Sequence, residues 1–496
     1  MKKAQLIFVP FPVIGHLVSM VETAKLLVRR YDHLSITVFL MKLPSDHMAH
    51  TYAHSLRVSG LNFITLPQPD PTPELTSPKS TNSFLHAFVT AYIPHLRSTV
   101  AQLIPSAPLA GFVLDMTCMP MIDVPNELGL PSYGYVPSSA ALLGTVFHLQ
   151  SLRDDHRRDV TEFSHSDAEL AVPCFANPVP AAVLPSLIVD DQEGGSTRVL
   201  ANARRLRDTK GILVNTCAEI ETYAVNYLKS GAPEIPPVYP VGPMLNLTVD
   251  AQEEDSSSGI MTWLDNQPPS SVVFLCFGSM GSFGADQLRE IAGGLERSGH
   301  RFLWSLRRPP LSAAGLPFPT DSSNQEEILP EGFVERTAGI GKIIGWAPQV
   351  AVLAHRAVGG FVSHCGWNSS LESVWWGVPV AAWPMYAEQQ LNAFEMVKEL
   401  GLWVEIRMDY KMDGYSGSLV SAEEIEKGIR GVMKGDGEVR RKVKEMRENV
   451  REAVTEGGSS HTSLGYFVEQ VMRKVENESS NLGLRQREGE KLILIG

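Results

Sequence analysis

Short apolar runs alternate with longer amphipathic stretches along the chain, which is the pattern of a parallel sheet covered by helices. Helical periodicity lies between most of the runs in the N-terminal half, as in Val18–Arg29 and Phe84–Leu103. The runs that predict strands in this half are Leu6–Val9, Ser35–Leu40, Leu61–Leu66, Gly111–Leu114, Ser132–Val136 and Gly211–Asn215. The polar and then Pro-rich segment Ser151–Asp191 is expected to form short helices and loops beside a pocket.

The same alternation restarts after an acidic, Ser-rich stretch, Asp250–Gly259, which is typical of a solvated linker. The second series of predicted strands is Val272–Phe277, Arg301–Leu306, Lys342–Trp346, Gly360–His364, Val378–Trp383 and Trp403–Ile406. We therefore expect an α/β protein with two Rossmann-like, doubly wound parallel-sheet domains, at residues 1–245 and 263–456, joined by a linker at 246–262.

The C-terminal part is predicted to be helical. Ser421–Lys434 opens with an S-x-x-E capping box, Glu438–Thr455 is a charged helix, and Leu464–Val475 is amphipathic. Segment 457–476 is treated as a separate C-terminal helix, and 477–496 as a flexible polar tail.

Composition narrows the function. The 496 residues suffice for two or three domains, and a net charge of −12 disfavours a nucleic-acid or anionic-membrane partner. No segment is long and apolar enough to span a bilayer. The five cysteines are scattered without CxxC spacing, which indicates free thiols in a reducing compartment. We expect a cytoplasmic protein that acts as a monomer.

One stretch, Trp346–Gln389, gathers many polar residues around a predicted strand, turn and helix. The strand Gly360–His364 leads through the turn 365–370 into the helix Leu371–Trp376. A helix N-terminus at such a turn presents free N–H groups and the positive end of the helix dipole, which favour a phosphate. His364 and Asn368 flank this point.

A purely structural interpretation competes with this one. Ser369-x-x-Glu372 also matches a capping box, and for that pair alone a helix cap is the more probable interpretation. A packing element, however, has little use for so many convergent polar groups. These groups are Trp346, Gln349, His364, Asn368, Ser369, Glu372, Glu388 and Gln389.

A histidine and an aspartate form the candidate catalytic pair. His16 follows the first predicted strand, near the start of a helix, and Asp115 ends another strand of the same sheet. The carboxyl edge of a parallel sheet is where open α/β folds bind ligands. The helix dipole favours a neutral imidazole, and an aspartate partner would orient it as a general base. Alternatively each residue caps its own turn, and Asp123 competes with Asp115.

The window from WAPQ at Trp346, through HCGWNS, to the closing EQ resembles plant family 1 UDP-dependent glycosyltransferases, which act on small secondary metabolites. The rest of the chain matches that family more loosely, in layout. The resemblance implies the GT-B fold, with a cleft between two domains that holds both substrates. It also implies that the C-terminal helix crosses back to the first domain.

The resemblance also assigns roles. His16 would be the general base and Asp115 its partner. Trp346 would stack on uracil, and the backbone of Ala347 would pair with the edge of uracil. The remaining donor contacts would be Gln349 and Glu372 to ribose, His364, Asn368, Ser369 and Ser279 to the diphosphate, and Trp367, Glu388 and Gln389 to the sugar.

The choice of sugar rests on weaker signals. A terminal Gln in this signature usually accompanies glucose. Many relatives carry a sugar-facing Thr where this chain has Pro137-Ser138-Ser139, so Ser138 or Ser139 would have to replace it. Gly15 is also expected near the sugar or acceptor.

With the roles that the resemblance implies, these residues predict an inverting O-glucosyltransferase that uses UDP-glucose and a small apolar acceptor, without a cofactor. No DxD motif occurs, so no metal is expected. The acceptor pocket should draw on segments 84–95, 116–145 and 180–205. Met116, Met119, Met121 and Leu184 from these segments, and Phe147 just beyond the second, favour flat phenolics (flavonoids, stilbenes or simple phenols), with terpenoids as the alternative.

Other functions remain open. A non-catalytic UDP-sugar binder would keep the donor window without chemistry, although the presence of both His16 and Asp115 argues against it. A Ser-His-Asp hydrolase would need a GxSxG elbow, whereas the order at Ser279 is Gly-Ser-Met-Gly. The dinucleotide motif GxGxxG and the P-loop motif are both absent.

Overall fold

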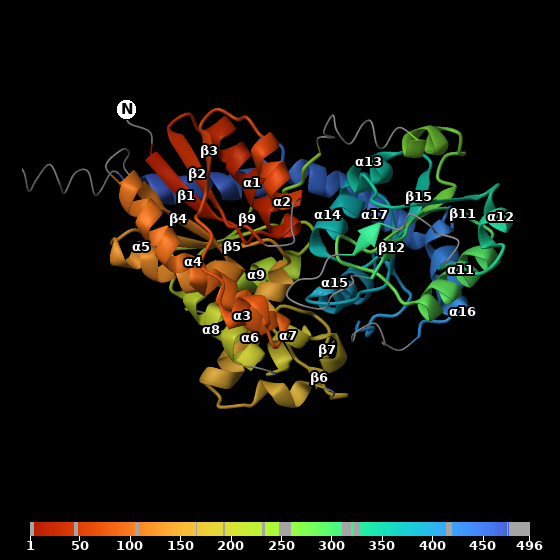
Figure 1. Ribbon diagram of the computed structural model, residues 1–496, viewed down its shortest axis with the longest axis horizontal. Coiled ribbons are helices and arrows are strands. Elements are labelled where there is room, and N and C mark those ends of the chain that lie inside the picture. The colour runs from red at the N-terminus through yellow and green to blue at the C-terminus, as the bar shows by residue number, and fades with distance from the viewer. Residues whose placement is uncertain are drawn as a thin grey trace, which may run out of the picture.

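Two parallel sheets, one in each half of the chain, lie side by side with helices around them (Figure 1). The structure is a computed structural model that describes residues 4–43, 48–104, 109–164, 166–191, 194–230, 234–247, 259–309, 319–321, 328–412, 419–473 and 475. The predicted fold class, two Rossmann-like α/β domains, is confirmed.

The first sheet has the order β3-β2-β1-β4-β5-β8-β9, and its neighbouring strands are parallel. Its strands are β1 (Ala4–Val9), β2 (Leu34–Leu40), β3 (Leu61–Thr65), β4 (Leu109–Asp115), β5 (Ser132–Val136), β8 (Ile212–Val214) and β9 (Val238–Pro240). The direction of the strand order reverses between β1 and β4, which is the topological switch point where such sheets bind ligands.

The second sheet has the order β14-β11-β10-β15-β16-β17, again with parallel neighbours. Its strands are β10 (Val272–Cys276), β11 (Arg301–Ser305), β14 (Gly341–Ile344), β15 (Val358–Ser363), β16 (Val380–Ala382) and β17 (Val404–Glu405). Its switch point lies between β10 and β15. Two short antiparallel pairs stand apart from the sheets: β6 (Glu169–Leu170) with β7 (Val179–Pro180), and β12 (Arg307–Arg308) with β13 (Thr320–Asp321).

Helices connect the strands. Those of the first half are α1 (Ile14–Arg30), α2 (Met48–Ser55), α3 (Pro73–Thr76), α4 (Thr81–Leu103), η1 (Met116–Ile122), α5 (Asp123–Glu127), α6 (Ala140–Asp154), η2 (Val160–Phe163), η3 (Ala181–Val183), α7 (Ser186–Val189), α8 (Gly195–Arg207) and α9 (Thr222–Ser230). Those of the second half are α11 (Ala285–Ser298), α12 (Phe333–Thr337), α13 (Gln349–Ala354), α14 (Trp367–Trp376), α15 (Gln389–Phe394), the π-helical η5 (Glu395–Glu399), α16 (Ala422–Met433) and α17 (Glu438–Ala453).

Both faces of each sheet are buried, because strand residues alternate between two apolar layers. In β1, Ile7 and Val9 pack with α4 and α6, whereas Leu6 and Phe8 pack with α1. The second sheet does the same, with one face packed against α11 and α16. The continuous apolar character of the predicted strands follows from this double burial.

A helix at residues 459–473 packs against the first sheet, behind β1 and β2 in Figure 1. The ring of Phe467 lies 5.0 Å from that of Tyr133 and 5.8 Å from that of Tyr239. Arg30 in α1 donates to the carbonyl oxygen of His461 at 2.7 Å. The last described helix of the chain is thereby attached to the first domain.

Some sequence expectations differ from the structure or lie outside it. Strand β9 was not predicted, since it lies in a Pro-rich stretch. Residues 259–265 form a helix, so the C-terminal end of the predicted linker is helical. Most of the expected acidic linker and all of the expected tail 477–496 lie outside the described residues. None of the helices in the described ranges is both long and apolar enough to cross a membrane.

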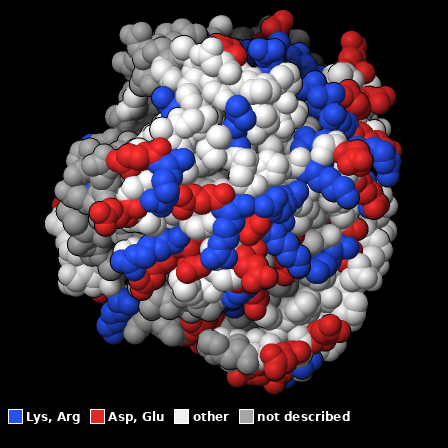
Figure 2. Space-filling model, turned by 90° about the vertical axis from the view of Figure 1, so that its right-hand side faces the viewer, with Lys and Arg blue, Asp and Glu red and all other residues white. Residues whose placement is uncertain are grey.

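The end of the molecule formed by the second domain mixes basic and acidic side chains closely (Figure 2). Arg336 pairs with Glu296 at 2.7 Å, and Arg430 with Glu426 at 2.8 Å. Positive and negative side chains therefore alternate on this face and do not form one basic stripe.

Candidate functional site

His16 and Asp115 meet at the switch point of the first sheet. Val9 at the end of β1 lies in register with Leu114 in β4, so the residues that follow these two positions emerge side by side. Nδ1 of His16 lies 2.9 Å from Oδ2 of Asp115. Helix α1 begins at Ile14, four residues before the predicted Val18, so His16 lies within its first turn.

Asp115 is fully buried and has two partners. Its second carboxylate oxygen accepts the backbone N–H of Thr117 at 2.8 Å, which caps η1. The structural role considered for Asp115 and the contact with His16 therefore coexist in one side chain. Asp123 is not the partner of His16, because it is exposed and pairs with Arg205 at 3.2 Å.

The charge state of His16 is set by opposing effects. Burial lowers the pKa of the ring, but the charge and hydrogen bond of Asp115 and the charge of Glu388 raise it, and the net pKa lies above 6.5. The carboxylates of Asp115 and Glu388 thus outweigh the helix dipole, which by itself favours a neutral ring. With Nδ1 bound to Asp115, Nε2 remains on a side chain that is 30% exposed.

The predicted phosphate turn follows β15 at the switch point of the second sheet. Helix α14 begins at Trp367, with Gly366 as its N-cap, so Ser369 and Glu372 lie inside the helix. The capping-box alternative is therefore wrong. Instead, Nε2 of Gln349 donates to Ser369 at 2.8 Å and to Glu372 at 2.7 Å. Burial raises the pKa of Glu372 to about 7, although the hydrogen bond from Gln349 opposes this.

His364 is held between two glycines. A Cβ at Gly278 would lie 2.4 Å from Nε2 of His364, and a Cβ at Gly366 would lie 2.6 Å from the same atom. Burial lowers the pKa of His364 to about 4, so the ring is neutral at pH 7. Its buried Nδ1 has no hydrogen-bond partner within the described part of the chain.

Helix α14 also touches the first domain. Nδ2 of Asn368 donates to the carbonyl oxygen of Gly15 at 2.8 Å, next to His16. The indole N–H of Trp367 donates to the carbonyl oxygen of Asn215 at 2.7 Å. The buried side chain of Trp367, expected at the sugar, is thus committed to the domain interface. Its backbone amide still lies in the first turn of the helix, where N–H groups lack intrahelical partners.

The expected sugar-binding residues lie at the same interface. Ser138 donates to Glu388 at 3.5 Å, so these two side chains face each other across the domains. Ser139 is less available, since it caps α6 and contacts Asn392 at 3.4 Å. Oε1 of Gln389 accepts the backbone N–H groups of Met385 and Tyr386, so its amide nitrogen is the end left for a ligand.

Trp346, the expected uracil platform, is 38% exposed just beyond β14, and Ala347 is buried beside it. Sequence reasoning missed a residue here. Arg307 lies with its guanidinium carbon 5.3 Å from the centre of the Trp346 ring and donates to the carbonyl oxygen of Ser279 at 2.8 Å. The available signal was its place just after β11, at the same carboxyl edge of the second sheet.

Four of the five apolar residues expected to line the acceptor pocket lie in the hydrophobic core. Met119, Met121, Phe147 and Leu184 are 0–1% exposed and belong to the core, whereas Met116 is partly buried. Their apolar character reflects packing, which sequence alone cannot separate from ligand contact.

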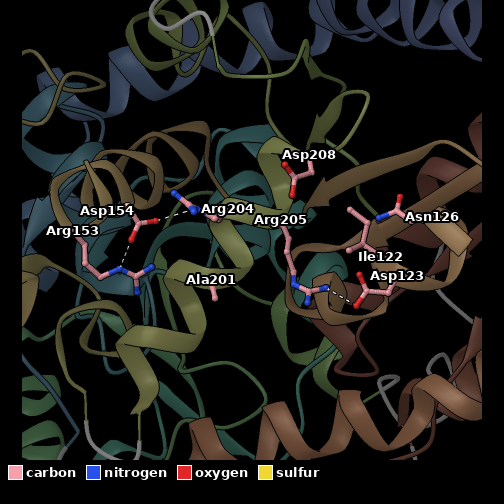
Figure 3. Close-up of a pocket in the computed structure, with 9 residues that line it drawn as sticks. All are labelled: Ile122, Asp123, Asn126, Arg153, Asp154, Ala201, Arg204, Arg205 and Asp208. Carbon is pink, nitrogen blue, oxygen red and sulfur yellow. Dashed lines mark hydrogen bonds and ion pairs between the residues drawn. The ribbon is translucent and has the colours of Figure 1, made fainter. Parts of the chain in front are cut away.

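A surface pocket of about 420 Å³ lies elsewhere on the first domain, where α5, α6 and α8 meet (Figure 3). Charged residues that pair with one another line it: Asp154 bonds Arg153 and Arg204, and Arg205 bonds Asp123. Asp123, the alternative to Asp115, lines this pocket, but His16, Asp115 and the candidate donor-site residues do not.

Comparisons with known proteins identify the family of the chain. Residues 238–415 match the family described as "UDP-glucoronosyl and UDP-glucosyl transferase". UDP-glycosyltransferase 71E1 of Stevia rebaudiana is 54% identical over 477 residues, covering 95% of this chain and 99% of the relative. UDP-glucose flavonoid 3-O-glucosyltransferase 6 of Fragaria ananassa is 53% identical over 489 residues, with 95% and 99% covered.

A solved structure extends the agreement to three dimensions. The crystal structure of Medicago truncatula UGT71G1 complexed with UDP-glucose matches with a TM-score of 0.83 and 44% identity, covering 95% of this chain and 98% of that one. This chain therefore belongs to the plant UDP-dependent glycosyltransferases, enzymes with the GT-B fold.

Proposed function

We propose that this protein is an inverting O-glucosyltransferase that moves glucose from UDP-glucose to a hydroxyl group of a small apolar acceptor, preferably a phenol. One arrangement supports this most strongly: the His16–Asp115 pair adjoins the N-terminus of α14, because Asn368 bonds the residue before His16. A general base and a phosphate-binding helix end thus belong to one site.

His16 acts as the base. Asp115 accepts the Nδ1 proton of the ring, so Nε2 carries the lone pair that faces the acceptor. As the acceptor oxygen attacks the anomeric carbon, its proton passes to Nε2 and the bond from that carbon to the UDP oxygen breaks, with the electron pair leaving on UDP. Attack opposite the leaving group converts an α-glucosyl donor into a β-glucoside. Asp115 then stabilises the imidazolium.

The second domain holds the nucleotide. Trp346 stacks on uracil beside the backbone of Ala347, while Gln349 and Glu372 bind the ribose hydroxyls. The amides at the start of α14 and the positive end of its dipole stabilise the charge that develops on the diphosphate. His364, Asn368, Ser369 and Ser279 complete this diphosphate site, and no metal is needed.

The sugar lies between the domains. Glu388 and the amide nitrogen of Gln389 bind glucose hydroxyls from the second domain. Ser138, which contacts Glu388, takes the place of the Thr expected from relatives. Gly15, the residue before His16, places its backbone next to the sugar.

Aromatic side chains next to the base support a phenolic acceptor. The ring of Phe11 lies 5.8 Å from that of His16, edge to face, and 6.0 Å from that of Phe88 in α4. Such surroundings favour a flat aromatic molecule whose hydroxyl reaches Nε2. The relative from Fragaria ananassa is named for flavonoids. The five cysteines are buried and form no disulfide, in keeping with our proposal that the enzyme works in the cytoplasm. We also propose that it acts as a monomer.

A product assay tests the proposal. UDP-glucose or UDP-galactose is mixed with a panel of a flavonol, a stilbene, a simple phenol and a terpenoid alcohol, with and without EDTA. We expect β-glucosides of the phenols at rates that EDTA leaves unchanged. His16→Ala should abolish transfer while the Kd for UDP changes less than about threefold. Equal loss of UDP binding, or UDP binding by the wild type without any product, would overturn the proposal.

A further inference from the structure

We infer that Arg307 is a positioning residue of the donor site, which holds the Trp346 indole and the loop at Ser279 in the arrangement that receives the nucleotide. The inference rests on the proposed function and assigns a role to a residue that the sequence motifs did not single out.

Arg307 ties together segments that are distant in sequence. It follows β11 and pairs in β12 with Asp321 of β13. One guanidinium nitrogen donates to the carbonyl oxygen of Ser279 at 2.8 Å, and the other terminal nitrogen donates to the carbonyl oxygen of Pro319. The planar fork of arginine makes such divergent contacts from a single rigid group, which a lysine cannot do.

The same guanidinium lies over Trp346, with its carbon 5.3 Å from the ring centre. Trp346 is 38% exposed, so the rest of its surface is open to a ligand. A cation against the ring restricts rotation of the indole. A platform that is fixed before binding loses less side-chain entropy when a base stacks on it.

The contact with Ser279 orients the loop after β10. Gly278 precedes it with a φ of +73°, next to the ring of His364. Since the peptide group is planar and trans, fixing the Ser279 carbonyl toward Arg307 turns the N–H of Met280 to the opposite side. Arg307 therefore sets two parts of the donor site from one position: the nucleobase platform and the backbone of the diphosphate loop.

The chain offers a matched control. Arg451 lies 5.3 Å from the ring centre of Trp375 and donates to the carbonyl oxygen of that residue at 3.1 Å. This stack has the same chemistry in the same domain, but it lies at the C-terminal end of α14, away from the donor site. Arg451→Met removes a comparable contact without touching the nucleotide.

The experiment compares Arg307→Met, Arg307→Lys and Arg451→Met with the wild type. For Arg307→Met we expect KM for UDP-glucose and Kd for UDP to rise roughly tenfold, with kcat and acceptor KM within about threefold of wild type. Arg307→Lys should show a smaller rise in both constants, since it keeps the charge but not the fork. Arg451→Met should leave KM for UDP-glucose unchanged, even if it lowers Tm as much.

Unchanged UDP affinity in both Arg307 variants, or an equal rise in Arg451→Met, would overturn the inference. If Arg307→Met does not fold, the inference is tested with Arg307→Lys alone, for which a weaker UDP affinity supports it and an unchanged affinity overturns it. Failure of the wild type to make any glucoside would instead count against the proposed function, and the UDP titration would still report on Arg307.

Discussion

Gly15 and Asn368 are 353 positions apart, yet Nδ2 of Asn368 donates to the carbonyl oxygen of Gly15 at 2.8 Å. Gly15 precedes His16, and Asn368 is the second residue of α14. This hydrogen bond thus holds the residue before the base of one domain against the helix N-terminus of the other. Both lie at the switch points of their sheets.

Asn368→Asp should separate this contact from helix stability. The substitution is nearly isosteric, but a carboxylate cannot donate to Gly15 and would repel a diphosphate. An acidic residue in the first turn favours the helix dipole, so α14 should stay folded. We expect KM for UDP-glucose to rise at least about tenfold with little loss of Tm. A drop in Tm without a change in KM would show that Asn368 serves only the domain interface.

Asp115→Asn should change both the rate and its pH dependence. Thr117 can still donate to the amide oxygen, but the amide nitrogen would face Nδ1 and force the proton onto Nε2, the wrong tautomer for a base. We expect kcat to fall by roughly 10²- to 10⁴-fold.

The pH profile checks this account of Asp115. Asp115 helps to raise the pKa of His16 above 6.5, and burial lowers it. In the wild type the acidic limb of kcat/KM should therefore show an apparent pKa above 6.5, and in Asp115→Asn it should move to lower pH. An unmoved limb would mean that another group titrates there.

Gly278→Ala should weaken donor binding through His364. Gly278 has a φ of +73°, and an added Cβ would lie 2.4 Å from Nε2 of that histidine. Gly299→Ala is the matched control, because Gly299 has a φ of +67° with open space around its Cβ position. Both variants should lose about 1 kcal/mol of stability from backbone strain. Only Gly278→Ala should raise KM for UDP-glucose, and similar KM values in the two variants would contradict this.

The alternation of apolar runs and amphipathic stretches was enough to predict the fold class. Apolar runs of strand length lie close to their observed bounds because both faces of each sheet are buried, and Ser132–Val136 was placed without error. The capping box at Ser421 was also confirmed. At Ser369 the same pattern did not mark a capping box. Gly366 caps α14, and Gln349 donates hydrogen bonds to both Ser369 and Glu372. A short motif cannot show which of two nearby residues starts a helix.

What sequence missed depends on partners far along the chain. Arg307 acquires a role only when Ser279 and Trp346 come beside it. Met119 and Phe147 look the same in sequence whether they line a pocket or fill the core, and the structure buries both. The raised pKa of His16 depends partly on Glu388, which belongs to the other domain. Such relations appear only after the two sheets are set side by side.

A buried carboxyl pair also joins the domains. Glu221 accepts the N–H groups of Ala140 and Ala141 at 2.8 and 2.7 Å, at the N-terminus of α6. Glu395, at the start of η5, is 4% exposed and lies close enough to Glu221 for the two side chains to influence each other's pKa. Burial, and then the charge of Glu221, raise the pKa of Glu395 well above its usual 4.5, so we expect Glu395 to hold its proton in the folded protein.

Glu395→Gln should therefore stabilise the protein increasingly as the pH rises. In the wild type the folded state keeps the proton of Glu395 while the unfolded chain releases it above pH 4.5, so stability falls by up to about 1.4 kcal/mol per pH unit until the folded-state pKa is reached. Glutamine has nearly the same shape as protonated glutamate and has no proton to lose. The Tm advantage of Glu395→Gln over the wild type should therefore grow from about pH 5 to about pH 8. Glu221→Gln, which loses an acceptor for one N–H group, should lower Tm at each pH. A constant Tm difference for Glu395→Gln would show that Glu395 is ionised in the folded protein.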